Sequence, residues 1–149
     1  MASEDFVSYN LMRYLQSDNW HILQYHPPGG QACLALKVFD EIVYPDIVSY
    51  KGGYIFVIEN KPRYSNSDIL KLEWMLSDED CKEQLIRFTH SYLCKNNIDI
   101  PKEYIFLLGH GYSGKQKTEL LNKVNLLFVN IGGNITINRS LENSNNDIL

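Results

Sequence analysis

The chain has no apolar segment long enough to cross a membrane as a helix. No run of apolar residues approaches the roughly 20 that a membrane span requires. Residues 1–5 are polar and acidic, whereas a secretory signal begins with basic residues followed by an apolar segment. We therefore expect a cytoplasmic protein that does not contact membrane.

Cysteine and histidine are scarce and scattered. Neither the three cysteines (Cys33, Cys81 and Cys94) nor the four histidines have the spacing of a zinc site. An odd number of cysteines without a repeating framework indicates free thiols in a reducing compartment. The sequence therefore predicts neither a zinc domain nor a disulfide scaffold.

An excess of basic residues, common in proteins that bind nucleic acid strongly, is also missing. The chain has 14 Lys and Arg against 18 Asp and Glu, which gives a formal net charge of −4. Strong binding to phosphates normally requires a basic surface. We therefore expect a small nucleic-acid contact, a homodimer, or a separate partner in a larger assembly. A bound cation would offset part of the acidity.

The 149 residues are 44% hydrophobic, which is enough for one domain with a core. Periodicity and turn residues predict first a helix capped by Ser3 and ended by residues 17–19, a strand over 20–25, a loop over 27–30 and an ambiguous apolar stretch over 32–39. Two hairpin strands over 44–49 and 54–61 follow, then a short helix or loop from 65–68 and a helix from 78 or 79 to 95. The last predicted elements are a strand over 104–108, a helix over 113–124, a strand over 126–131 and an edge strand over 134–138. This order predicts an α/β fold, a mixed β-sheet flanked by helices on both faces. We expect one domain over residues 1–139 and a flexible tail over 140–149.

The strongest functional signal is a hairpin with charges where a buried strand normally excludes them. Two apolar, β-prone stretches, residues 44–49 and 54–61, are joined by a short glycine-containing connection. The first carries Asp46, and the second ends with Glu59 and Lys61. The simpler alternative is a surface hairpin with a salt bridge, but the apolar run before Glu59 favours a central strand.

The alternation of side chains along a strand brings these charges together. Glu59 and Lys61 share one face, and the residue between them points to the other. A turn centred on residues 51–52 would place Asp46 opposite Val57, one step along the same face from Glu59. Two carboxylates and an ammonium then converge on one patch, which suits a divalent cation beside a scissile phosphate.

These residues also carry a resemblance to a known family. Pro45-Asp46, followed further along by Glu59-Asn60-Lys61, resembles the signature of the PD-(D/E)XK nuclease superfamily, which has the restriction-endonuclease-like fold. The resemblance covers residues 4–131. It implies a central sheet in an α-β-β-β-α-β order, a divalent metal and hydrolysis of phosphodiester bonds.

The resemblance also implies roles for individual residues. Asp46 and Glu59 would bind Mg²⁺, or Mn²⁺ in its place, with help from the backbone carbonyl of Asn60. Lys61 would position the attacking water. Glu4 would supply a third carboxylate from the first helix, although an acid there is also favoured by the helix dipole alone.

Nucleic-acid contacts are expected beyond this motif. Arg63 and Tyr64 follow Lys61 and are placed to meet the phosphate backbone, unless they belong to a solvated loop. Gln84 resembles the glutamine-containing motif of the RecB-like branch, although Phe88 stands where a tyrosine is usual. An ordinary helix glutamine is the alternative.

A second motif resembles a phosphate-binding P-loop. Residues 109–115 follow a predicted strand and end in Gly114-Lys115, but Gln116 stands where a Mg²⁺-binding Ser or Thr is required. A glycine-rich turn is the preferred interpretation. In it, His110 and Lys115 face nucleic acid.

The sequence therefore predicts a Mg²⁺-dependent hydrolase, a DNA endonuclease of restriction or repair type. Three alternatives stay open: a domain of this fold that binds nucleic acid or protein without cleavage, an RNA nuclease, and a P-loop nucleotide-binding protein. RNA recognition by shape and 2′-hydroxyl groups would leave no motif here.

Overall fold

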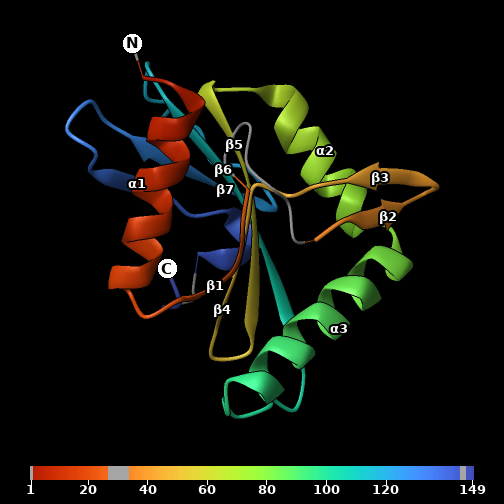
Figure 1. Ribbon diagram of the computed structural model, residues 1–149. Helices are drawn as coiled ribbons and strands as arrows, with labels where there is room; N and C mark the ends of the chain where they lie inside the picture. Colours follow the sequence, from red (N-terminus) through yellow and green to blue (C-terminus); the bar gives the residue numbers. More distant parts are fainter. Residues whose placement is uncertain (1, 27–33, 145–146) are drawn as a thin grey trace.

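The computed structural model describes residues 2–26, 34–144 and 147–149 (Figure 1). Its elements, in chain order, are α1 (Glu4–Ser17), β1 (His21–Tyr25), β2 (Leu36–Val38), β3 (Glu41–Val43), β4 (Ile47–Lys51), β5 (Tyr54–Arg63), α2 (Asn66–Leu76), α3 (Glu79–Lys95), β6 (Ile105–Ser113), β7 (Val124–Val129), β8 (Ile135–Asn138) and a short 3₁₀ helix (Leu141–Asn143). In this part of the chain no helix is long and apolar enough to span a membrane.

Each α-helix begins at a side chain that accepts a backbone N–H of its first turn. The capping residues are Ser3 for α1, Ser65 for α2 and Asp78 for α3. Such caps satisfy N–H groups that have no partner within the helix. They confirm the predicted starts of the first and long helices, and they make the segment from Ser65 a helix rather than a loop.

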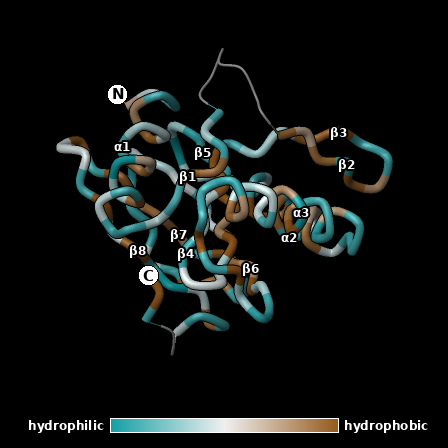
Figure 2. The backbone as a smooth tube through the Cα atoms, turned by 60° about the horizontal axis from the view of Figure 1, so that its bottom comes forward, coloured by the Kyte–Doolittle hydropathy of each residue, from teal (hydrophilic) through white to brown (hydrophobic). Residues whose placement is uncertain are grey.

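The helices cover both faces of one six-stranded sheet. The strand order is β1-β4-β5-β6-β7-β8, and a separate two-stranded sheet pairs β2 with β3. In Figure 1, α1 lies on one side of the large sheet, and α2 and α3 lie on the other. Hydrophobic and hydrophilic residues alternate along the helices, as expected for helices with one buried face (Figure 2). The predicted mixed α/β architecture is confirmed.

Strand β5 lies inside the sheet, antiparallel to β4 and parallel to β6. Its apolar residues alternate between two cores. Phe56 and Ile58 face Leu11 of α1, whereas Ile55 and Val57 belong to the core under α2 and α3. Burial on both faces explains the unbroken apolar run before Glu59.

The predicted register of the β4–β5 hairpin is wrong. The turn consists of Gly52 and Gly53, which both have positive φ, at 53° and 93°. Two such residues suit a two-residue turn whose twist matches that of the strands. Ile47 therefore pairs with Ile58, and Val57 pairs with Val48 rather than with Asp46. Continuing this register places Asp46 opposite Glu59.

The predicted helix over residues 113–124 is also wrong. Strand β6 continues to Ser113 and β7 begins at Val124, so only ten residues connect them, and they form no helix. A helix this short is marginal without a packed apolar face. Leu120, which would supply such a face, is 57% exposed.

The glycines of the P-loop-like motif serve close contact between layers. A Cβ at Gly109 would lie 2.7 Å from the ring of Phe56, and one at Gly111 would overlap Asn60 Oδ1 and Leu11 Cδ1. Because no helix follows the motif, it lacks the helix N-terminus that binds phosphate in a P-loop.

The remaining predictions have mixed outcomes. The strands predicted over 20–25, 104–108, 126–131 and 134–138 appear as β1, β6, β7 and β8, and the ambiguous stretch contributes β2. The loop predicted over 27–30 lies outside the described residues. In the expected flexible tail, Ser140 and Asn143 are buried, and the Ser140 N–H donates to Asn125 Oδ1 at 2.8 Å.

Candidate metal and catalytic site

Two carboxylates meet where β4 begins and β5 leaves the hydrophobic core. Asp46 directly precedes β4, and Glu59 lies on β5. The Asp46 N–H lies 3.4 Å from Glu59 Oε2, and the two side chains interact directly. Glu59 is only 3% exposed, whereas Asp46 is half-buried. The hairpin thus brings the two predicted ligands together more directly than the sequence interpretation required.

Asn60 presents its backbone to this pair and its side chain to the opposite face. Its N–H donates to Asp46 Oδ2 at 2.7 Å. Its side-chain amide donates to Ser8 Oγ at 3.0 Å, under α1. The main chain of Asn60 is therefore near the carboxylates, and metal binding by its carbonyl stays a prediction.

Two lysines form ion pairs in this region, one with Asp68 and one with Glu59, and the sequence interpretation missed the second. Lys61 Nζ lies 3.9 Å from Asp68 Oδ1, and its side chain is 47% exposed. Lys71 Nζ lies 2.5 Å from Glu59 Oε1. Asp68 and Lys71 are three residues apart on α2, a spacing that places both on one helix face. That spacing was visible in the sequence, but nothing in it showed that α2 lies over Glu59.

Burial dominates the electrostatics of the carboxylates, and a hydrogen bond between the two side chains lowers the pKa of Asp46 and raises that of Glu59. Burial raises the pKa of Asp46, and the charge of Glu4 adds to this shift. Burial, followed by the charge of Asp46, raises the pKa of Glu59 to about 8, although Lys71 opposes the shift. Burial lowers the pKa of Lys71, but the neighbouring carboxylates outweigh it and the net shift is upward. The carboxylate pair therefore holds a proton near neutral pH.

His110 connects the elements that form the site. It is fully buried, which corrects the expectation that it faces nucleic acid. Its Nε2 accepts the Ser65 N–H at 2.9 Å, so the ring proton lies on Nδ1, 3.1 Å from the Glu59 carbonyl oxygen. Burial lowers the pKa of His110 and keeps the ring neutral. The histidine thereby joins β6, β5 and the start of α2, which carries Lys71.

The donor set suits a small, hard cation. Within residues 2–26, 34–144 and 147–149, no group of three or more His, Cys, Asp and Glu side chains is arranged to hold a metal ion. Mg²⁺, however, usually takes only one or two carboxylates, with waters and substrate phosphates completing its shell. Asp46 and Glu59 match this smaller set. The ammonium of Lys71 against Glu59 shows that the site accommodates a positive charge.

The other predicted site residues lie at different distances from this centre. Glu4, at the start of α1, is near enough for its charge to act on Asp46. Gln84 is remote: its amide accepts the Lys37 N–H at 2.9 Å and donates to the Lys37 carbonyl at 2.8 Å, which ties β2 to α3. This arrangement favours the ordinary structural interpretation of Gln84. Arg63, Tyr64 and Lys115, the other predicted contacts, line one pocket beyond Lys61.

The raised pKa of Glu59 predicts a loss of stability at alkaline pH. Between its ordinary value of 4.5 and about 8, the folded protein keeps a proton that the unfolded chain has released. This contribution is complete below the unfolded value and is lost as the pH rises through the folded one. Urea unfolding at about pH 6 and about pH 9 should show a fall of at least about 1 kcal/mol in the free energy of unfolding.

Glu59→Gln should remove most of this fall, because the amide does not titrate. Mg²⁺ should restore the free energy of unfolding of the wild-type protein at the higher pH and have little effect on that of the variant. An equal pH dependence in both proteins would show that Glu59 does not titrate in this range.

Comparison with known proteins adds no assignment to this geometry. No family model, no curated protein and no solved structure matches the chain.

Proposed function

We propose that this protein is a metal-dependent nuclease that hydrolyses phosphodiester bonds, with DNA as its substrate. One observation carries the proposal: Asp46 and Glu59, from the two arms of one hairpin, form a largely buried carboxylate pair. Lys61 follows Glu59 by two residues on the same strand, and its exposed ammonium lies 3.9 Å from Asp68 Oδ1. Two ionised carboxylates this close together are unfavourable, so without a cation the pair holds a proton near neutral pH. A divalent cation would displace that proton and neutralise both carboxylates. This placement of Asp46 and Glu59 supports the resemblance to the PD-(D/E)XK nucleases, including their restriction-endonuclease-like fold.

Each residue has a defined part in this proposal. Asp46, Glu59 and the main chain of Asn60 would hold the cation, and a bound Mg²⁺ would activate water and neutralise charge on the phosphate. Lys61, which reaches solvent, would orient the attacking water and stabilise the developing charge. Lys71 would balance the charge of Glu59 until the cation binds. Positioning and charge suffice, so no covalent intermediate is needed.

The ion pair between Lys71 and Glu59 supports a second candidate function. An ammonium already lies against Glu59, which is how a domain of this fold that binds nucleic acid without cutting it would neutralise its carboxylate. In that account Lys61 contacts phosphate only, and replacing it weakens binding without affecting any hydrolysis.

Cleavage assays separate the two candidates. Supercoiled plasmid, labelled single-stranded DNA and labelled RNA would each be incubated with the protein in Mg²⁺, Mn²⁺ or Ca²⁺. We expect cleavage of DNA in Mg²⁺ or Mn²⁺ and a loss of about 100-fold or more in Lys61→Ala. Lys102→Ala, an exposed lysine before β6, is the matched control and should cut normally.

Three results would contradict the proposal. Cleavage that survives Lys61→Ala would place the activity elsewhere. Cutting of RNA alone would correct the substrate. A folded wild-type protein that binds DNA but cuts none of the substrates would favour the binding module.

A further inference from the structure

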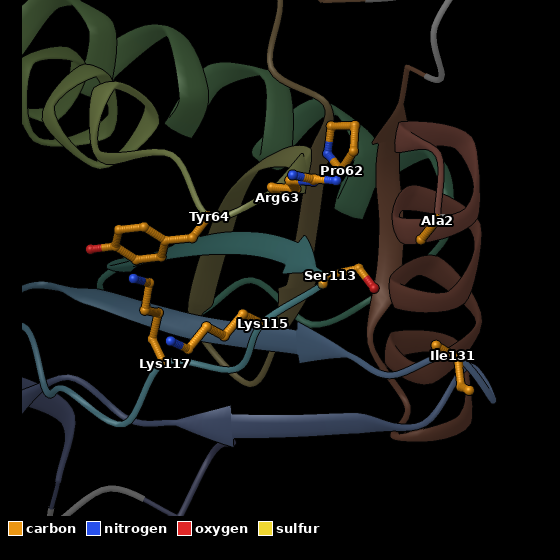
Figure 3. Close-up of a pocket in the computed structure, with 9 residues that line it drawn as sticks. Ala2, Pro62, Arg63, Tyr64, Ser113, Lys115, Lys117 and Ile131 are labelled. Atoms are coloured by element: carbon orange, nitrogen blue, oxygen red, sulfur yellow. The ribbon is translucent and has the colours of Figure 1, made fainter.

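A pocket of about 450 Å³ lies beyond Lys61, outside the carboxylate pair. Arg63, Lys115 and Lys117 supply its charge, and Ala2, Pro62 and Ile131 supply apolar surface. Figure 3 shows the lysines on the connection after β6, Arg63 and Pro62 at the end of β5, and Ile131 across the pocket. The volume lies in the range of small-molecule sites.

The charge of this pocket is opposite to that of the whole protein. Three cations and no acidic residue line it, although the chain carries a net charge of −4. Within the described residues, no salt bridge joins Lys115 or Lys117 to a carboxylate. The Lys117 Nζ instead lies 5.0 Å from the centre of the Tyr64 ring. The Glu119 carboxylate lies next to the pocket, where it hydrogen-bonds the Tyr64 side chain, but among the described residues it forms no salt bridge with either lysine. With Arg63 and two lysines in its lining, the pocket therefore favours an anion.

The connection that carries the lysines is shaped to place them. Gly114 has a φ of +82°, which turns the chain at the end of β6 and brings it against the Arg63 side chain. The Lys117 N–H then donates to Tyr112 Oη at 2.8 Å. The segment predicted to be a helix is therefore fixed over the carboxyl ends of two parallel strands, where open sheets commonly bind ligands.

The pocket continues the proposed catalytic surface along one strand. Arg63 follows Lys61 by two residues on β5, a separation of roughly 7 Å in an extended strand. This matches the step between neighbouring phosphates of a nucleic acid. A nucleic-acid strand whose scissile phosphate lies at Lys61 can therefore place its adjacent phosphate among Arg63, Lys115 and Lys117.

The apolar wall distinguishes a nucleotide from a bare anion. Ile131 is 96% exposed at the turn between β7 and β8, and it forms one side of the pocket with Ala2. An inorganic phosphate would gain nothing from this surface. A base or sugar would cover it and remove apolar area from water.

We propose that this pocket binds one nucleotide of a single strand, with its phosphate on the three cations and its nucleoside against Ile131 and Pro62. A cationic groove combined with aromatic side chains on which bases stack is the usual chemistry of single-strand binding, and Tyr64 lines this pocket. The assignment of this strand as the substrate rests on the proposed nuclease function. The pocket would hold the nucleotide next to the scissile phosphate.

Binding measured without divalent metal tests the pocket separately from cleavage. Fluorescence anisotropy with a labelled single-stranded oligonucleotide in EDTA would compare wild type with the double variant Lys115→Gln and Lys117→Gln. The matched control is Lys95→Gln with Lys102→Gln, which removes the same charge near the opposite end of β6. We expect about 10-fold weaker binding in the pocket variant alone, with a salt dependence reduced by about 0.7 for each phosphate that the variant no longer binds.

Competition identifies the ligand. A nucleoside monophosphate should displace the oligonucleotide at lower concentration than inorganic phosphate does, and Ile131→Ser should remove this difference. Equal competition by the two would overturn the nucleotide assignment, and equally tight binding of duplex DNA would overturn the single-strand assignment. Equal binding by the pocket and control variants would overturn the pocket itself.

The outcomes separate this inference from the nuclease proposal. Asp46→Asn should keep oligonucleotide binding, because Asp46 does not line the pocket. Pocket-dependent binding in a protein that cuts nothing would support the pocket and count against the nuclease. Normal cleavage combined with binding that does not depend on Lys115 and Lys117 would support the nuclease and count against the pocket.

Discussion

Asp46→Asn is expected to reduce cleavage by about 1000-fold and to leave the protein at least as stable as wild type. The substitution removes a charged ligand, and a loss of about 4 kcal/mol in transition-state stabilisation corresponds to three orders of magnitude in rate. The fold should not suffer, because the side-chain amide oxygen introduced at this position can still accept the Asn60 N–H that Asp46 Oδ2 accepts now. Removing a negative charge beside Glu59 also relieves repulsion.

The combination of these two effects is the informative result. Single-turnover cleavage and urea unfolding would be measured on the same preparations, with Asp99→Asn, an exposed carboxylate on the loop after α3, as the control. A purely structural Asp46 would lose stability and activity together. Unchanged cleavage in a stable Asp46→Asn protein would remove this residue from the site.

Gly111→Ala should destabilise the protein by about 3 kcal/mol, or roughly 10 °C in Tm. Gly111 lies on β6 beneath α1, and an added Cβ would overlap the Asn60 side chain and Leu11. Both neighbours are buried, so neither has room to move away. Thermal unfolding followed by circular dichroism measures the effect.

The same substitution should also impair the site. Moving Asn60 disturbs the N–H that holds Asp46, so cleavage below the melting temperature should fall as well. Gly132→Ala is the matched control: Gly132 is exposed, and its nearest neighbour, Asn130 Oδ1, would lie 3.3 Å from the new Cβ. Equal stability of the two variants would show that the α1 layer tolerates a larger residue at position 111.

The hairpin shows what the sequence could and could not predict. Apolar runs joined by glycines predicted two paired strands, and alternation placed Glu59 and Lys61 on one face. The register failed because the strands are joined by Gly52-Gly53 alone, not by a turn centred one residue earlier. A shift of this size moves Asp46 by two residues along its partner and turns a nearby carboxylate into a direct neighbour of Glu59.

The sequence did not predict the positions of Lys71 and His110 in the site, because those positions depend on tertiary structure. Nothing in the local sequence singled out Lys71, and His110 lay inside a motif that resembled a P-loop. Only the docking of α2 against the sheet brings Lys71 to Glu59. Only the burial of β6 turns the His110 ring toward the Glu59 carbonyl and Ser65. Neither placement follows from local periodicity.

The helix predicted over residues 113–124 is also absent because of tertiary structure. Residues 113–124 have a composition typical of a helix, but β6 and β7 take the residues at both ends. The connection that remains carries Lys115 and Lys117 into the pocket beside Arg63. Lys115 was predicted as a nucleic-acid contact from the P-loop-like motif; it lies in the pocket for which we propose nucleotide binding, and its role stays a prediction.

The acidic net charge also finds a local explanation in this account. The carboxylates of the proposed metal site and the cations of the pocket are separated along β5. A substrate strand would then meet positive charge on one side and a metal-neutralised pair on the other. The net charge of the chain does not reveal this arrangement, because every exposed charge elsewhere in the protein counts equally toward that sum.

Binding of Mn²⁺, located by nuclear magnetic resonance, tests the central claim most directly. Mn²⁺ is paramagnetic and broadens the amide signals of nearby residues, so even weak binding can be placed in the structure. We predict that the signals of Asn60 and Lys61 broaden first in wild type, and that Asp46→Asn and Glu59→Gln abolish this selectivity. If a folded wild-type protein shows no selective broadening, or the variants show the same pattern, Asp46 and Glu59 do not form a metal site.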